Sequence, residues 1–197
     1  MHLIKEHDLD SFLSDDHFNV LFNYAQYSTT QILLNEFMQT KFATIDGVRK
    51  HTEVPIHLHD VFDLHPSGQL HKAGLEMQTK ELSDVHYHST TPLEVDQPQI
   101  VADGPYDLVY VNLPYKLPQS PNSVDLVVAE TIKLWWSGME IGAIIIIPDY
   151  DKLSVRRQVD MFVRSKKCES MKYFDTNWDR PELGEDHFMI ALQKHEI

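Results

Sequence analysis

The stretch that decides the fold is residues 106–150, YDLVYVNLPYKLPQSPNSVDLVVAETIKLWWSGMEIGAIIIIPDY. An apolar run at 107–111 stops at Asn112, and residues 122–136 then place apolar side chains at helical spacing. The run at 141–147, IGAIIII, has no polar alternation, which is typical of a strand in the middle of a sheet covered on both faces. The order strand, helix, strand therefore predicts a parallel crossover in an α/β fold.

Shorter patterns extend this order toward the amino terminus. The run HFNVLF at 17–22 has the aromatic and β-branched content of a buried strand, and Ser28-Thr29-Thr30 can cap a helix that reaches about Gln39. We expect two further strands and a leading amphipathic helix, at residues 41–45 (KFATI), 54–59 (VPIHLH) and 3–14. The first of these strands ends at Asp46 and the second at Asp60.

The remaining segments complete the predicted sheet. A helix is expected at 153–165, and a pair of strands at 170–175 and 187–194 suggests an antiparallel finish. Residues 65–104 have a blurred pattern, with a helix expected at 71–82, and we interpret them as an insertion or lid. The sequence thus predicts a single domain over 1–197, with a doubly wound, mostly parallel seven-stranded sheet whose last strand is antiparallel.

Composition and charge narrow the classes of partner. The chain has 30 acidic and 17 basic residues and a formal charge of -13, which disfavours binding to nucleic acid or anionic lipid. A small-molecule substrate or a protein partner fits this charge better. The single cysteine, Cys168, and the absence of a long apolar stretch or a signal-peptide core lead us to expect a cytoplasmic protein. The sequence does not indicate an oligomeric state.

The strand order and the motifs at 106–115 and 127–163 resemble the class I S-adenosylmethionine-dependent methyltransferases. Within that fold, the run from the tryptophan-rich helix end to the Asp-Tyr pair is most similar to the cephalosporin-hydroxylase-like methyltransferases. The resemblance spans nearly the whole chain. It implies S-adenosylmethionine as cofactor and a ligand site at the carboxyl ends of the strands.

The resemblance also assigns residues to the cofactor. Residues 18–34 fall where the family has its first strand, glycine-rich loop and following helix, so Asn23, Tyr24 and Ser28 would face the methionine moiety. Asn23 stands at a position where the family has glycine, which allows the backbone to approach the ligand. Asp46 would accept the ribose hydroxyls and Asp60 would lie near the adenine. An Asp-Gly pair such as 46–47 is equally typical of an ordinary turn.

The tetrapeptide Asn112-Leu113-Pro114-Tyr115 matches the NLPY variant of a motif found in methyltransferases that act on amines. In that motif the Asn carbonyl and a backbone carbonyl accept both hydrogens of the target amine, and the Tyr stacks on the substrate. This match implies catalytic roles for Asn112, Pro114 and Tyr115. The simpler interpretation is a turn after a strand, because Pro cannot extend a central strand.

Two metal hypotheses remain as alternatives. Metal-dependent O-methyltransferases hold magnesium with acids after the fourth and fifth strands; Asp149 fits the second position, but Asn112 replaces the first acid. The histidine pairs 57/59 and 86/88 have the two-residue spacing of strand positions that share a face, so each pair could chelate zinc. With one cysteine and no regular ligand spacing, packing or surface histidines are favoured, and we do not expect a metal cofactor.

Two functions follow from these observations. The first is transfer of a methyl group from S-adenosylmethionine to an amine or hydroxyl of a small molecule or base. The alternative is a catalytically inactive methyltransferase-fold protein that serves in binding or assembly. The missing glycines favour the alternative, as does the segment 46–53, which is too short to hold a crossover helix between the two strands expected at 41–45 and 54–59.

Overall fold

A computed structural model describes residues 15–36, 41–61, 79–90, 103–112, 121–166, 171–175 and 188–195. Their strands form one sheet in the order β3-β2-β1-β4-β5-β7-β6. The strands are β1 Ile32–Glu36, β2 Ile56–Val61, β3 Val85–Thr90, β4 Tyr106–Asn112, β5 Met139–Ile147, β6 Met171–Asp175 and β7 Phe188–Gln193. The helices are α1 Asp15–Ala25, α2 Lys41–Arg49, α5 Pro121–Gly138 and α6 Leu153–Lys166. The mixed sheet confirms the predicted fold class.

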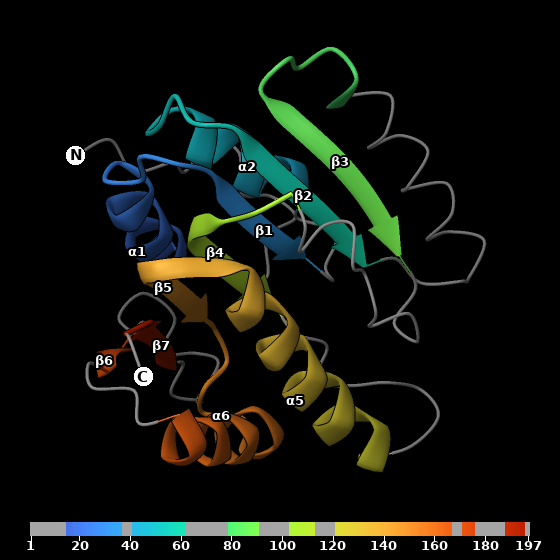
Figure 1. The fold of residues 1–197 in the computed structure, drawn as a ribbon, viewed down its shortest axis with the longest axis vertical. Coiled ribbons are helices and arrows are strands. Elements are labelled where there is room, and N and C mark those ends of the chain that lie inside the picture. Colours follow the sequence, from blue (N-terminus) through green and yellow to red (C-terminus); the bar gives the residue numbers. More distant parts are fainter. Residues whose placement is uncertain are drawn as a thin grey trace.

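Strand direction follows the doubly wound pattern. Strands β1 to β5 are parallel to one another, whereas β7 runs antiparallel to both β5 and β6. The arrowheads of β1, β2 and β3 accordingly point the same way in Figure 1. The carboxyl ends of the parallel strands therefore meet at one edge of the sheet, which is where open α/β sheets bind ligands.

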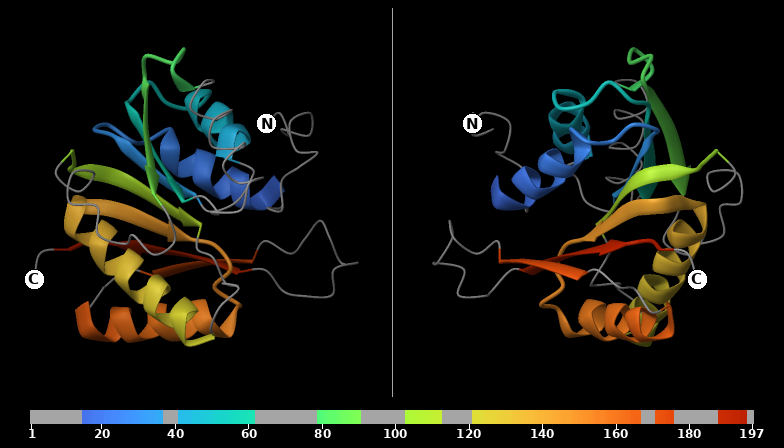
Figure 2. Two further views of the ribbon diagram at one scale, coloured as in Figure 1. Left: turned by 90° about the vertical axis from the view of Figure 1, so that its right-hand side faces the viewer. Right: turned by 60° about the vertical axis from the view of Figure 1, so that its left-hand side comes forward.

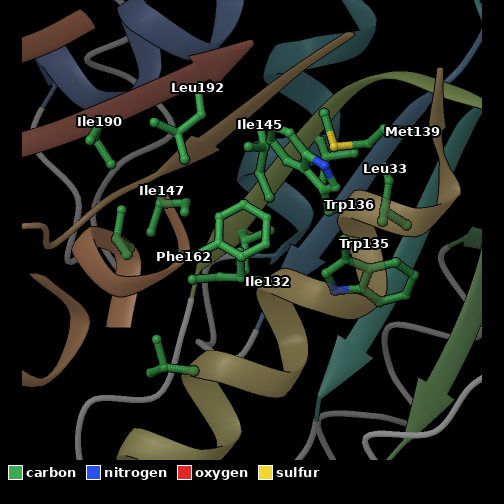
Figure 3. Close-up of a cluster of buried hydrophobic side chains, with 14 of the residues drawn as sticks. Leu33, Ile132, Trp135, Trp136, Met139, Ile145, Ile147, Phe162, Ile190 and Leu192 are labelled. Carbon is green, nitrogen blue, oxygen red and sulfur yellow. The ribbon is translucent and has the colours of Figure 1, made fainter. Parts of the chain in front are cut away.

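Helices cover both faces of the sheet (Figure 2), as the apolar central strands require. On one face, Leu21 and Phe22 of α1 and Ile45 of α2 pack with alternate residues of β1, β2 and β4. On the other face, α5 and α6 pack against β4, β5 and β7, with Trp135 fully buried in the cluster that Figure 3 shows. Residues of β4 and β5 alternate between these two cores because side chains alternate along a strand.

The first predicted strand was wrong, because residues 17–22 belong to helix α1. Leu21, Phe22 and Ala25 are buried, and the intervening Asn23 is exposed, which is the spacing of a helix that packs by one face. The aromatic and branched side chains that suggested a strand therefore serve helix packing instead.

The expected helix from Ile32 to Gln39 was also wrong where the structure describes it. Ile32, Leu33 and Leu34 are fully buried in consecutive positions, which a central strand with two covered faces explains. The expected strand at 41–45 is instead the first half of α2. Helix α2 is thus the crossover between β1 and β2. The expectation that residues 46–53 leave no room for a crossover helix was therefore wrong, because the helix begins at Lys41.

Gly47 lies inside α2 rather than in a turn. A Cβ atom at this position would lie 2.3 Å from Cζ of Phe22, so glycine here allows α1 and α2 to approach closely. The Asp-Gly pair that suggested a turn therefore reflects helix packing.

Most of the later elements lie where the sequence predicts them. Strands β2, β4, β5, β6 and β7 and helices α5 and α6 agree with the expected segments to within about two residues at each end. The interpretation of residues 65–104 as an insertion or lid was wrong for 85–90, because β3 pairs with β2 and is an outermost strand of the sheet. Residues 3–14 and residues 71–78 lie outside the described part of the chain.

None of the described helices has both the length and the apolar character that a membrane crossing requires.

Candidate active site

The strand order places a ligand site between β1 and β4. From β1 the sheet grows in one direction through β2 and β3, and in the other through β4 and β5. The crossover helices leave on opposite faces at this switch point, so the carboxyl ends of β1 and β4 border a crevice. Residues at these two strand ends are therefore the first candidates for ligand contact.

Backbone register aligns three polar residues at this edge. Glu36 of β1 is paired with Asp60 of β2 on one side and with Asn112 of β4 on the other. Asp60 is paired in turn with Ser89 of β3. Two carboxylate residues and an amide thus occupy neighbouring positions where the strands end, with Glu36 and Asn112 on the two sides of the switch point.

A buried polar pair lies one register position below this row. The Nδ2 atom of Asn35 donates a hydrogen bond to Nδ1 of His59 over 2.6 Å, and both side chains are buried. The ring of His59 also meets the ring of Trp135 edge to face, with centroids 5.0 Å apart. This pair joins β1 to β2 immediately before Glu36 and Asp60.

Asn112 and Asp149 lie where the sequence places them. Asn112 is the last residue of β4 and is 3% exposed, and the four residues before it in the strand are also buried. Asp149 follows β5 with a φ of 55°, a left-handed conformation that Asp tolerates better than most residues. Its carbonyl oxygen accepts a hydrogen bond from the amide of Lys152 (3.0 Å), which leads the chain into α6. Pro114 and Tyr115 lie outside the described residues.

The predicted positions of Asn23, Tyr24 and Ser28 were wrong. These residues precede β1, and therefore lie at the amino edge of the sheet, opposite the edge of Glu36 and Asn112. Tyr24 and Ser28 line a hollow of about 300 Å³ with residues from the beginnings of β4 and β5. Burial raises the pKa of the Tyr24 phenol, so its hydroxyl stays protonated at neutral pH.

The turn at 28–30 has a structural partner. The carboxylate of Asp107, in β4, accepts hydrogen bonds from the Ser28 hydroxyl and from the backbone amides of Thr29 (2.5 Å) and Thr30 (3.0 Å). The residues expected to cap a helix instead attach the α1–β1 connection to β4. Their assignment to the cofactor loses its basis.

Neither Asp46 nor Asp60 lies where the prediction placed it. Asp46 lies in α2 and pairs with Lys50 one turn later, with 2.7 Å between Oδ2 and Nζ. Asp60 lies near the end of the second strand, where the acid that accepts ribose hydroxyls was expected, rather than at the end of a third strand. The assignment of Asp46 to the strand end was therefore wrong.

Glu36 is not among the site residues that the sequence predicts. Its signal is the run ILLNE at 32–36, in which a continuous apolar segment ends on two polar residues. Residues 37–40, which connect β1 to α2, are Phe-Met-Gln-Thr and contain no glycine. The absence of glycine that bears on the expected cofactor loop therefore concerns residues 37–40 of the sequence, and not residues 23–28.

Comparison with solved structures agrees with this topology. The O-methyltransferase from Bacillus cereus in complex with SAH superposes with a TM-score of 0.62 over 96% of this chain and 84% of that one, at 12% identity. An rRNA methylase from Streptococcus thermophilus gives 0.58, with 90% and 95% covered at 12% identity. TrmN from Thermus thermophilus gives 0.61, with 95% and 51% covered at 14% identity. The chain has the class I methyltransferase fold.

The methyltransferase fold is established by structure and not by sequence. No protein-family model matches the chain, and no curated protein matches it by sequence. At 6 to 15% identity, the similarity to these structures supports the arrangement of strands and helices but does not assign a role to any residue. Roles for individual residues must therefore come from the geometry of this chain.

Proposed function

We propose that the chain is an S-adenosylmethionine-dependent methyltransferase whose acceptor is an amine, or less favourably a hydroxyl, of a small molecule or base. The observation that carries this proposal is the alignment of Asn112 with Glu36 across the switch point of a methyltransferase fold. That edge is the binding edge of open α/β sheets. Structural neighbours crystallised with SAH support the choice of cofactor.

The residues at the carboxyl edge fit the cofactor chemically. A carboxylate at the end of a second strand can accept two neighbouring ribose hydroxyls with its two oxygens, and Asp60 is at this position. Glu36 offers a second carboxylate suited to the ammonium group of the methionine moiety. When bound, S-adenosylmethionine supplies a methyl group on a positively charged sulfur.

Asn112 is the proposed positioning group for the acceptor. Its side-chain oxygen can accept one hydrogen of an amine while a neighbouring backbone carbonyl accepts the other, which directs the nitrogen lone pair. The match of residues 112–115 to the NLPY motif extends this proposal to Pro114 and Tyr115 as residues of the acceptor site. The net charge of -13 favours a neutral or cationic small molecule over a polyanion.

Calorimetric titration with S-adenosylhomocysteine tests the proposed cofactor edge. We expect micromolar binding that Asp60→Ala weakens by about tenfold or more, since losing a hydrogen-bonded charged group costs about 1.5–3 kcal/mol. Asp46→Ala is the matched control, because Asp46 lies on α2 and pairs with Lys50. Equal loss in both variants, or no heat at millimolar ligand, contradicts the proposal.

A second candidate is a methyltransferase-fold protein that binds a protein partner and does not catalyse. The specific observation in its favour is that FMQT, the sequence between β1 and α2, contains no glycine, the residue type that lets a backbone approach a ligand most closely. Methyl transfer to an added acceptor separates the two candidates, because a protein that does not catalyse gives none, and Asn112→Ala then tests the role of Asn112. The enzyme predicts lost transfer with cofactor affinity retained, whereas unchanged turnover removes Asn112 from the reaction.

A further inference from the structure

Four histidines gather on one face of the β2–β3 pair. His57 is in register with His86, and His59 with His88. The ring of His57 stacks on those of His86 and His88, with centroid distances of 4.7 and 5.6 Å. Residues two apart on a strand share a face, which explains why two separate pairs in the sequence meet in space.

Two of these histidines and Asp103 present ligand atoms close together. The Nδ1 atom of His57 lies 3.4 Å from Nε2 of His88. One ring nitrogen of His57, one of His88 and a carboxylate oxygen of Asp103 all lie within 4.8 Å of one another. A tetrahedral zinc ion with bonds of about 2.0–2.1 Å to nitrogen separates its ligands by about 3.3–3.4 Å. The two imidazole nitrogens already have that separation.

Hydrogen bonds around Gln31 fix the tautomer of His57. The Gln31 side-chain amide donates to the carbonyl oxygens of Asp103 (2.7 Å) and Pro105 (3.2 Å). Its Oε1 atom lies 2.9 Å from Nε2 of His57, and an amide oxygen can only accept. The proton of His57 is therefore on Nε2, and the lone pair of Nδ1 faces His88. Metal-binding histidines are commonly oriented in this way by a partner on the other nitrogen.

Buried His57 and half-buried His88 already share this position through one hydrogen bond, because Nδ1 of His57 accepts from Nε2 of His88 at 3.4 Å. A metal ion bound between the two rings would take the place of that hydrogen bond, and His88 would then carry its proton on Nδ1.

We propose that His57, His88 and Asp103 form a binding site for a divalent transition metal of the zinc type, with water at the fourth position. Two imidazoles and one carboxylate are a common zinc ligand set. Gln31 and Asp103 precede β1 and β4, so the site lies toward the amino edge of the sheet, away from Glu36 and Asn112. A metal there links β2, β3 and the segment before β4, and it stabilises that corner of the fold independently of the proposed methyl transfer.

Titration of the metal-free full-length chain with Zn²⁺, against a chromophoric chelator, tests this site. We expect one tightly bound equivalent and, with Co²⁺ as the probe, the visible absorption of a tetrahedral complex. His88→Gln and Asp103→Asn should weaken binding by more than about 100-fold, since removing only a hydrogen-bond partner of a ligand costs about 10–100-fold. Gln31→Leu should therefore fall within that smaller range.

His86→Gln is the matched control, because His86 lies on β3 and stacks on His57 but is outside the three-residue set. Its zinc affinity should stay within a few-fold of the unaltered chain. Thermal unfolding without metal identifies variants that fail to fold. His88 is half-buried, so His88→Gln provides the test even if replacing buried His57 prevents folding. Binding that survives His88→Gln, an equal loss in His86→Gln, or no binding tighter than millimolar each overturns the proposal.

Discussion

At the residue scale, Gly47 is explained by a contact and not by a turn. A methyl group at this position would meet the Phe22 ring at 2.3 Å, so Gly47→Ala should lower the free energy of unfolding by about 1–3 kcal/mol through overpacking. Denaturant unfolding of Gly47→Ala, Phe22→Leu and the double variant measures the effect. Gly47→Ala should cost less in the Phe22→Leu background than beside the native Phe22 ring. Equal costs in both backgrounds would show that the ring is not the cause.

The buried Asn35–His59 pair supports a second prediction at this scale. Asn35→Ala removes the donor to Nδ1 of His59 and leaves a buried acceptor without this hydrogen bond, which should cost about 1–3 kcal/mol of stability. Replacing both residues by apolar ones of similar size should cost less than the sum of the single changes. Strict additivity in urea unfolding would contradict a direct hydrogen bond between these side chains.

At the element scale, the ion pair of Arg49 and Asp84 attaches the end of α2 to the turn before β3. Two hydrogen bonds of 2.6 and 3.0 Å join the guanidinium to the carboxylate, and that contact lowers the pKa of Asp84 below its ordinary value of 3.8. A lowered pKa means that the pair's stabilisation is present above the ordinary value and is lost as the pH falls below it. Because both side chains are about one-third exposed, we expect only about 0.2–1 kcal/mol.

The pH dependence of unfolding checks this ion pair. The stability difference between the unaltered chain and Asp84→Asn should shrink as the pH falls below about 4, because Asp84 of the unfolded chain, at its ordinary pKa of 3.8, begins to be protonated there. In an Arg49→Gln background the same comparison should show little difference at any pH. A pH-independent difference in both backgrounds would assign the effect of Asp84→Asn to something other than the pair.

The elements that the sequence predicts well are those with long and unambiguous patterns. The β4, α5, β5, α6 order follows from continuous apolar runs and an extended helical repeat. The segments before residue 50 are short, and HFNVLF at 17–22 or ILL at 32–34 fits either a strand or a buried helix. Packing against neighbouring elements decides between these states, and packing is not visible in one local stretch.

The residues of the candidate site divide in the same way, into those that the sequence places correctly and those that it does not. The positions of Asn112, Asp60 and Asp149 at strand ends were predictable because their strands are, and their roles remain predictions. Asn23, Tyr24, Ser28 and Asp46 were misplaced because helix and strand were interchanged in the predicted elements before residue 50: α1 and the start of α2 were expected as strands, and β1 as a helix. Glu36 was missed for the same reason.

At the scale of the whole molecule, the sheet has two edges with different chemistry. The carboxyl edge aligns Glu36, Asp60 and Asn112 by register. The amino edge holds the histidine site and a hollow lined by Tyr24, Ser28 and Asp107. The fold alone favours the carboxyl edge for a nucleoside ligand, because parallel strands direct their carboxyl ends and the following helix amino termini toward it.

The most direct test of this account is a titration of isotope-labelled protein with S-adenosylhomocysteine, followed by amide chemical shifts. We predict the largest shifts at Glu36, Asp60 and Asn112, with little change at Gln31 and Asp103 on the opposite edge. Shifts concentrated around the amino-edge hollow, or none at saturating ligand, would contradict the claim that this methyltransferase fold holds its cofactor at the carboxyl ends of β1, β2 and β4.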